Sequence, residues 1–235
     1  MKILLVLPSY NEKENIENIL MELLKQPCSL DILVVDDNSP DNTAQIVKNI
    51  QVRESRVFLI ERSAKLGLGS AYLTGFKWGL QKEYDYFFAM DADLSHNPND
   101  ISRFIEEIEK GFDLVVGSRY LKGTISVAGW DFRRLILSKF ANWYATKILG
   151  IKRYTDVTSG YRVYSRKALE KINLESIKSN GYAFQIEMVY KIHKAGLKIA
   201  EIPIIFYERE NGSSKMSKEI ALEAAIMVWK LRLWR

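Results

Sequence analysis

The stretch Tyr86-Phe87-Phe88-Ala89-Met90-Asp91-Ala92-Asp93 decides the fold that this sequence predicts. Its first five residues form an apolar run typical of a buried strand, and two aspartates emerge where that strand ends. Open α/β sheets bind their ligands at the carboxyl ends of the strands. Two carboxylates one residue apart repel each other unless positive charge lies beside them, and Mg²⁺ or Mn²⁺ bound to phosphate oxygens would supply it. Asp-x-Asp alone more often marks a turn or a helix cap, so the neighbouring motifs decide.

Strand and helix patterns alternate through the first half of the chain. Strands are expected over residues 2–7, 31–35, 57–60, 84–90 and 113–116, with helices over 14–25, from about 41, 68–81 and 98–110. Beyond them we expect a helix over 132–149, a strand near 161–164, a helix over 181–195, a strand over 198–203 and a loop over 208–217. Near-continuous apolar strands between amphipathic helices predict an α/β fold with a mostly parallel, Rossmann-like sheet and helices on both faces.

Composition narrows the class of protein. The chain has 235 residues, of which 47% are hydrophobic and 27% charged, as is ordinary for a soluble globular domain. Cys28 is the single cysteine, so no disulfide can form within the chain, in agreement with a reducing compartment. No apolar run is long enough to cross a bilayer, so we expect the protein to meet a membrane only at its surface or through a partner.

The net charge of +5 is concentrated in one segment. Residues 119–153 carry one acid, Asp131, against eight basic residues, which are Arg119, Lys122, Arg133, Arg134, Lys139, Lys147, Lys152 and Arg153. Basic residues interleaved with aromatic ones indicate nucleic acid, an anionic membrane surface or a phosphate site, and a solvated helix face is the plainer alternative. No nucleic-acid-binding motif is recognisable, and acids in the crevice would repel a polyanion, so nucleic acid is not expected as a partner.

Three polar clusters follow three of the predicted strands. They are Pro8-Ser9-Tyr10-Asn11-Glu12 after the first, Asp36-Asp37-Asn38-Ser39 after the second and Asp91-Ala92-Asp93 after the fourth. One such cluster would be unremarkable in a loop, whereas three at the same edge of a sheet indicate a ligand crevice.

These clusters resemble those of the family 2 glycosyltransferases, which have the GT-A fold. Further matching motifs are Leu66-Gly67-Leu68-Gly69, Gly117-Ser118-Arg119-Tyr120, Gly129-Trp130, Asp156-Val157-Thr158-Ser159-Gly160-Tyr161-Arg162 and Gly212-Ser213-Ser214-Lys215. Within the family, the set is similar to the polyprenol (dolichol) phosphate mannosyltransferases, which move mannose from GDP-mannose to a lipid phosphate. The resemblance covers nearly the whole chain.

The resemblance implies a set of donor-binding residues. Those expected at the sugar nucleotide are Pro8, Tyr10, Glu12, Asp37, Lys65, Asp91, Ala92 and Asp93. Tyr10 would stack on the base and Glu12 would accept hydrogen bonds, the alternatives being a packed loop tyrosine and a carboxylate at a helix N-terminus. Gly67 and Gly69 would cradle a phosphate or simply form a tight turn.

The metal and catalytic roles also follow from the resemblance. Asp91, Asp93 and Ser95 would hold Mg²⁺ or Mn²⁺, with Ser95 at the place where the family commonly has Gln. His96 is expected behind the ligands or as a loop residue. Asp93, Asp156 and Arg119 are the expected catalytic residues. Asp156 would orient sugar hydroxyls or act electrostatically, or else anchor its loop, with Arg162 as a structural partner.

The acceptor phosphate is expected at basic residues. The candidates are Arg119, Arg134, Ser138, Arg209 and Lys215. Arg134 and Ser138 are four residues apart and share one helix face, whereas Arg133 is turned by about 100° and is expected to be a surface charge.

The predicted reaction is a direct displacement at the anomeric carbon with inversion. A UDP-sugar enzyme such as a polyprenyl-phosphate glucosyltransferase is the nearest alternative. A catalytically silent nucleotide-binding subunit that regulates a membrane partner is the second. We expect a cytoplasmic protein that is peripheral at the cytoplasmic face of a membrane. The expected partners are the sugar nucleotide, the polyprenyl phosphate and the bilayer surface, and a membrane-spanning protein is a further candidate.

The predicted organisation is one GT-A domain over residues 1–217 and an amphipathic helix over 218–235. Apolar residues at helical spacing form a stripe along this helix, namely Ile220, Ala224, Met227, Leu231 and Trp234. Lys230, Arg232 and Arg235 lie near its end, a mixture expected at a lipid headgroup boundary. The stripe would lie in a membrane interface, or it would pack on the domain's own core.

Overall fold

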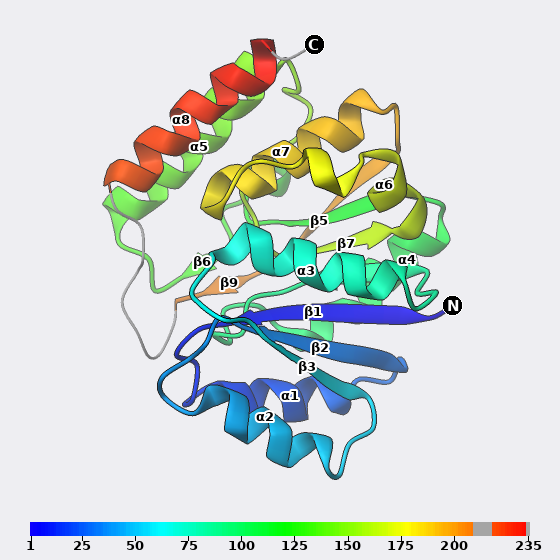
Figure 1. The fold of residues 1–235 in the computed structure, drawn as a ribbon. Helices are drawn as coiled ribbons and strands as arrows, with labels where there is room; N and C mark the ends of the chain where they lie inside the picture. The colour runs from blue at the N-terminus through cyan, green and yellow to red at the C-terminus, as the bar shows by residue number, and fades with distance from the viewer. Residues whose placement is uncertain (209–217, 234–235) are drawn as a thin grey trace.

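A seven-stranded sheet forms the centre of the molecule (Figure 1). The computed structural model describes residues 1–208 and 218–233, except for the side chains of 182 and 218–224. In spatial order the strands are β3 (Val57–Glu61), β2 (Leu30–Asp36), β1 (Ile3–Ser9), β4 (Tyr86–Ala89), β7 (Arg162–Ser165), β5 (Leu114–Ser118) and β8 (Ile199–Pro203). All neighbours pair in parallel except β7, which is antiparallel to both β4 and β5. The α/β fold with a mostly parallel sheet is therefore confirmed.

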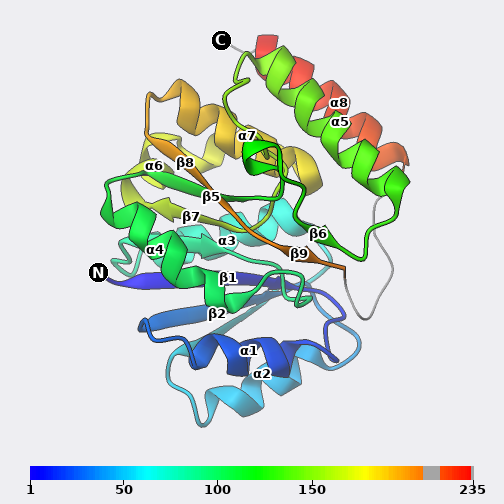
Figure 2. The same cartoon turned by 180° about the vertical axis from the view of Figure 1, so that it is seen from behind.

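Helices cover both faces of this sheet (Figures 1 and 2). On one face are α1 (Ile16–Leu24), α2 (Thr43–Gln51) and α4 (Ile101–Glu109), and their apolar residues share one core cluster. On the other are α3 (Leu68–Leu80), α5 (Phe132–Leu149), α6 (Arg166–Lys171), α7 (Gly181–Lys194) and α8 (Lys218–Leu233). The short strands β6 (Val127–Ala128) and β9 (Phe206–Tyr207) pair outside the main sheet.

The apolar strands supply both cores because their side chains alternate between the two faces. On β1, Leu4 and Val6 enter the α3 side while Ile3 and Leu5 enter the α1 side. This double burial explains why the strands read as continuous apolar runs. Helix α3 can approach β1 closely because it carries glycine there: a β-carbon on Gly75 would lie 2.4 Å from Val6 Cγ1.

The sequence pattern missed three small elements. The helix α6 has six residues, and β6 and β9 have two residues each, which is too short for a periodic signal. None of the helices in the portions that the structure describes is long and apolar enough to cross a membrane.

Helix α8 packs on the domain, alongside α5 and α7 (Figure 1). Val228 and Leu231 are buried in the same core cluster as α3 and α7, and Met227 packs against it. The side chains of Ile220 and Ala224, and all of Trp234, lie outside the described residues. The described members of the predicted stripe thus face the core, and the exposed face of α8 is a different one, with Ile226, Trp229 and Leu233.

Candidate active site at the carboxyl edge of the sheet

Asp93 is held in a tight turn after β4. Its Oδ1 atom accepts hydrogen bonds from the Ser95 backbone N–H at 3.1 Å and from Ser95 Oγ at 2.5 Å. Leu94 between them has a φ of 62°, the left-handed conformation that such a turn requires. Both Asp93 and Ser95 are buried. The structure therefore shows a Ser95 hydroxyl that orients Asp93, and its role as a metal ligand stays a prediction.

Asp91 is positioned by three other parts of the chain. Tyr72 Oη donates to Asp91 Oδ1 at 3.1 Å, and the Asp91 backbone N–H donates to His96 Nδ1 at 3.3 Å. The backbone of Gly160 lies against the Asp91 carboxylate, so that a β-carbon there would be 3.3 Å from Oδ2. Burial, and then the negative charge of Asp91, raises the pKa of Tyr72 well above its usual value, so this phenol remains a neutral donor.

The two aspartates fit a hard divalent cation by the chemistry of their oxygens. Mg²⁺ and Mn²⁺ prefer carboxylate and phosphate oxygens over nitrogen or sulfur. Among the residues that the structure describes, no group of three or more His, Cys, Asp and Glu side chains gathers that could hold a metal. If a cation binds at Asp91 and Asp93, phosphate oxygens and water would supply further ligands. The His96 ring stacks on Tyr161 with 4.9 Å between the ring centroids, and its Nδ1 accepts the Asp91 backbone N–H, so a place behind the ligands stays a prediction.

Tyr10 and Lys65 meet at the far side of the same edge. They follow β1 and β3, and Lys65 Nζ lies 4.1 Å from the centre of the Tyr10 ring. Pro8 belongs to β1 itself, and Ala92 is buried between Asp91 and Asp93 in the sequence. Glu12 lies just before α1, and its Oε2 accepts a hydrogen bond from Asn15 Nδ2 at 2.9 Å. The structure thus brings an aromatic ring and a cation together where a base and a phosphate are predicted to bind.

Asp37 stabilises the turn at Leu66 and Gly67, just before α3. Its carboxylate forms a buried ion pair with Arg62 and accepts the backbone N–H groups of Leu66 at 3.1 Å and Gly67 at 3.0 Å. Gly67 has a φ of 96°, and its carbonyl accepts from Arg62 Nη2 at 3.0 Å. Because the Gly67 N–H is already bound, the structure supports the tight-turn alternative over the phosphate cradle. Arg62, the partner of Asp37, was missed because a lone arginine after a strand carries no pattern.

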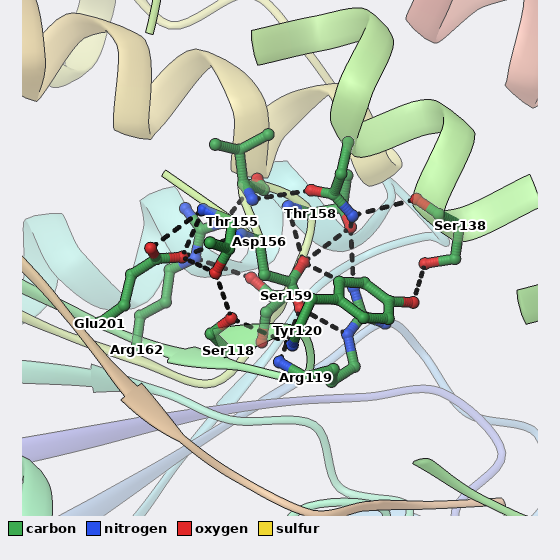
Figure 3. A network of polar contacts seen from close by, with 12 residues as sticks. Ser118, Arg119, Tyr120, Ser138, Thr155, Asp156, Thr158, Ser159, Arg162 and Glu201 are labelled. Carbon is green, nitrogen blue, oxygen red and sulfur yellow. Dashed lines mark hydrogen bonds and ion pairs between the residues drawn. The ribbon is translucent and has the colours of Figure 1, made fainter. Parts of the chain in front are cut away.

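Asp156 forms a buried, bidentate ion pair with Arg119 (Figure 3). Arg119 Nε lies 2.6 Å from Oδ2 and Nη2 lies 2.8 Å from Oδ1, and the Arg119 backbone N–H adds a third bond of 3.0 Å. Burial alone would raise the pKa of Asp156, but the Arg119 guanidinium and these hydrogen bonds hold it below its usual value. The predicted pairing of Asp156 with Arg162 was wrong: the Arg162 guanidinium is fully buried and donates to the backbone carbonyls of Val157, Ser159 and Gln185.

Glu201 on β8 binds the backbone of the loop that carries Asp156 (Figure 3). Its carboxylate accepts the backbone N–H groups of Thr155 at 2.9 Å and Asp156 at 2.8 Å. Burial raises the pKa of Glu201, and the two N–H groups oppose that effect. Glu201 was not predicted, because a single acid within a strand gives no sign that it binds the backbone of the loop at Thr155 and Asp156.

Two of the residues predicted for the acceptor, Arg119 and Arg134, lie beside Trp130. The Arg134 guanidinium lies 4.3 Å from the centre of a Trp130 ring, and that of Arg119 lies 5.3 Å from it. Arg134 also pairs with Glu208 at 2.5 Å, and Ser138 Oγ accepts from Tyr120 Oη at 2.7 Å. Arg133 is exposed, as expected. The predicted residues Arg209 and Lys215 lie outside the described residues.

The sheet order and the helices on both faces define a fold of the GT-A type, and comparisons with known proteins identify the family. The model of glycosyl transferase family 2 matches residues 4–173, and the chain belongs to that family. It is an enzyme of the glycosyltransferase class.

Two curated relatives are similar over almost the whole chain. The polyprenol monophosphomannose synthase of Mycolicibacterium smegmatis is 43% identical, with 97% of this chain and 87% of the relative covered. The undecaprenyl-phosphate mannosyltransferase of Micrococcus luteus is 40% identical, with 97% and 93% covered. Among solved structures, glucosyl-3-phosphoglycerate synthase from Mycobacterium tuberculosis, solved with Mn²⁺, UDP and glucosyl-3-phosphoglycerate, has a TM-score of 0.70 at 18% identity. The alignment covers 98% of this chain and 79% of that one, and it supports the fold.

Proposed function

We propose that this enzyme transfers mannose from GDP-mannose to a polyprenyl phosphate, with inversion and with Mg²⁺ or Mn²⁺ at Asp91 and Asp93. The observation that carries this proposal is the loop 156–160, which connects the Asp91 carboxylate to a cluster of arginine and aromatic side chains. At one end Gly160 lies against the Asp91 carboxylate, and at the other Asp156 holds Arg119 beside Trp130 and Arg134. Carboxylates suit a metal-bound diphosphate donor, whereas paired arginines suit an anionic acceptor. Both relatives described above are named as mannosyl-transferring enzymes of polyprenyl phosphates, which supports this choice of acceptor and sugar.

The chemistry needs no strong base. As an oxygen of the lipid phosphate bonds to the anomeric carbon, the bond from that carbon to the donor phosphate breaks and the nucleoside diphosphate leaves. The attacking phosphate is already ionised at neutral pH. Asp156 agrees with this scheme because its charge is committed to Arg119, and its lowered pKa makes it a poor proton acceptor. A bound divalent cation would stabilise the leaving diphosphate as a Lewis acid.

The donor can be identified by thermal shift with Mn²⁺ present. Binding raises stability as RT ln(1 + [L]/Kd), so the correct sugar nucleotide should raise the melting temperature most. We expect GDP-mannose to exceed UDP-glucose. The reverse order would favour the alternative of a UDP-sugar glycosyltransferase. Binding without any transfer to polyprenyl phosphate would favour the silent regulatory subunit.

Arg134→Ala should raise the KM for polyprenyl phosphate by about tenfold or more, the value of one charge-assisted contact. The reason is that the Arg134 and Arg119 guanidinium groups both lie over the Trp130 ring, and that Arg134 is half-buried at the proposed acceptor site. Arg133→Ala is the matched control, since Arg133 is the exposed neighbour on the same helix. Steady-state kinetics with both variants measure the difference.

The KM for GDP-mannose should change little in either variant. Equal acceptor KM values for the two variants would contradict the proposed site. So would an Arg134→Ala effect that falls mainly on the sugar nucleotide.

We further propose that the outer face of α5 and α8 contacts an anionic lipid bilayer. The two helices run side by side in both views (Figures 1 and 2). Their exposed apolar side chains are Phe132, Ile136, Leu137, Phe140, Trp143, Ile226, Trp229 and Leu233. Exposed Lys139 and Lys147 interleave with them, which suits acidic headgroups. Ser138 of the proposed acceptor site lies on the same helix, so this face would bring the site to the lipid phosphate.

Trp143→Glu combined with Trp229→Glu should reduce co-sedimentation with vesicles of phosphatidylcholine and phosphatidylglycerol severalfold. Both indoles are about half exposed, so their loss should leave the melting temperature nearly unchanged. Val52→Glu is the control, because Val52 is an exposed apolar residue on another face, after α2. Full sedimentation of the double variant would contradict the proposal.

A further inference from the structure

Gln185 on α7 is a buried amide whose hydrogen bonds the protein does not satisfy. Its side chain is 2% exposed, and among the described residues neither Nε2 nor Oε1 has a hydrogen-bond partner. Leaving a buried primary amide unpaired is unfavourable, so such groups are rare in folded proteins. Its neighbour Glu187, equally buried, receives the backbone N–H of Ser179 at 3.0 Å and pairs with Lys191. Gln185 differs from Glu187 in that both polar atoms of its side chain lack a hydrogen-bond partner among the described residues.

Contacts around Gln185 connect it to Asp91, one of the two proposed metal ligands. The Arg162 guanidinium donates to the Gln185 carbonyl and to the Ser159 carbonyl, both at 2.7 Å. Ser159 precedes Gly160, whose backbone lies against the Asp91 carboxylate. A second connection runs through Phe184, whose ring stacks on Tyr72 at 5.9 Å, and Tyr72 Oη donates to Asp91.

Ser159 shows the same property as Gln185. Its Oγ atom is buried and has no hydrogen-bond partner within the described part of the chain. The residues before and after it are both engaged: Thr158 Oγ1 accepts from Arg119, and Gly160 touches Asp91. Gln185 and Ser159 are thus two uncharged polar residues with unused side-chain hydrogen bonds, and one guanidinium binds the backbone carbonyls of both. Ser159 directly precedes Gly160, which lies against Asp91.

We propose that the Gln185 amide and the Ser159 hydroxyl bind hydroxyl groups of the sugar that is transferred. A primary amide offers two donors and an acceptor, and a hydroxyl offers one donor and two acceptor lone pairs, which together match adjacent sugar hydroxyls. The amide oxygen only accepts hydrogen bonds, so it suits a sugar hydroxyl better than a phosphate oxygen. This inference rests on the proposed function, because it assigns the sugar subsite of that same reaction. It makes Gln185 a determinant of sugar recognition, separate from nucleotide recognition.

The test compares a nucleotide with and without its sugar. Gln185→Met keeps the length of the side chain but removes its hydrogen bonds, and Gln81→Met is the control at an exposed position after α3. Calorimetry with Mn²⁺ measures the affinities for GDP and GDP-mannose. In Gln185→Met the affinity for GDP-mannose should fall by about tenfold or more, while that for GDP stays within about twofold. Ser159→Ala should act in the same direction.

Stability provides the second readout. Because the native amide has no protein partner, Gln185→Met should leave the melting temperature unchanged or raise it. A lower melting temperature, or equal losses of GDP and GDP-mannose affinity, would show a structural role and overturn the inference. Unchanged binding of both ligands would overturn it as well.

Sugar-nucleotide binding by the wild-type protein shows whether a negative result contradicts this inference or the proposed function. If the wild-type protein binds UDP-glucose and not GDP-mannose, the proposed donor is wrong. The same comparison of Gln185→Met with UDP and UDP-glucose then decides the role of Gln185. If the wild-type protein binds no sugar nucleotide, both proposals fail.

Discussion

Asp93→Asn should reduce mannosyl transfer by about a thousandfold or more, the effect of losing a main electrostatic contact to a transition state. The fold should survive, because asparagine keeps the Oδ1 atom that accepts both hydrogen bonds from Ser95. What disappears is the carboxylate charge on a residue that is almost fully buried at the end of β4. Mn²⁺-dependent binding of GDP should be lost together with turnover.

Calorimetry of GDP with and without Mn²⁺ measures this change, and circular dichroism checks the fold. Asp100→Asn is the control, because Asp100 lies nearby at the start of α4 and pairs with Arg103 outside the turn. An Asp93→Asn protein that keeps the wild-type gain in GDP affinity from Mn²⁺ would contradict the metal assignment.

The second large effect is expected at the ion pair between Arg119 and Asp156. Arg119→Met leaves the Asp156 carboxylate buried without its counter-charge, which should lower the free energy of unfolding by about 3–5 kcal/mol. Asp156→Leu should have a comparable effect through an unpaired guanidinium. The double variant should recover part of that loss, because two apolar side chains leave no buried charge. Urea denaturation of the four proteins measures the coupling between the two residues.

The same pair should make stability depend on pH at the acidic end. The pKa of Asp156 is lower in the folded protein than its usual value. A carboxyl of this kind stabilises the fold above its unfolded pKa of about 3.9, and that contribution is lost as the pH falls through the lower folded value. The difference in stability between wild type and the double variant should therefore shrink below about pH 4. A constant difference between pH 7 and pH 3 would contradict the lowered pKa.

Most of the fold could be predicted because its signals are local and repeated. The strands β1, β2 and β4 are continuous apolar runs, and each is followed by polar residues, which is why a ligand crevice is predicted at their carboxyl ends. The antiparallel insertion of β7 between β4 and β5 could not be read from the sequence, since strand order depends on long-range packing. The inward face of α8 was ambiguous for a similar reason: an apolar stripe shows amphipathicity without showing what covers it.

Individual candidate residues were predicted, but their partners were not. Asp156 and Arg119 were both predicted, yet they are 37 positions apart, and their bidentate pairing depends on the return of the chain to the sheet after α5. Gln185 gave no signal, since a glutamine inside an apolar helix resembles any other polar interruption. Its side chain lacks a hydrogen-bond partner among the described residues, and this property depends on the three-dimensional packing around it.

The central claim is that this site moves mannose from GDP-mannose to a lipid phosphate. The most direct measurement is the transfer of radioactivity from GDP-[¹⁴C]mannose into the organic phase with polyprenyl phosphate, using the wild-type protein with Mg²⁺ or Mn²⁺. We expect labelled lipid in this reaction, none with free polyprenol as acceptor and none after chelation of the metal. Labelled lipid from UDP-[¹⁴C]glucose in place of GDP-[¹⁴C]mannose, or undiminished transfer in excess chelator, would contradict the account.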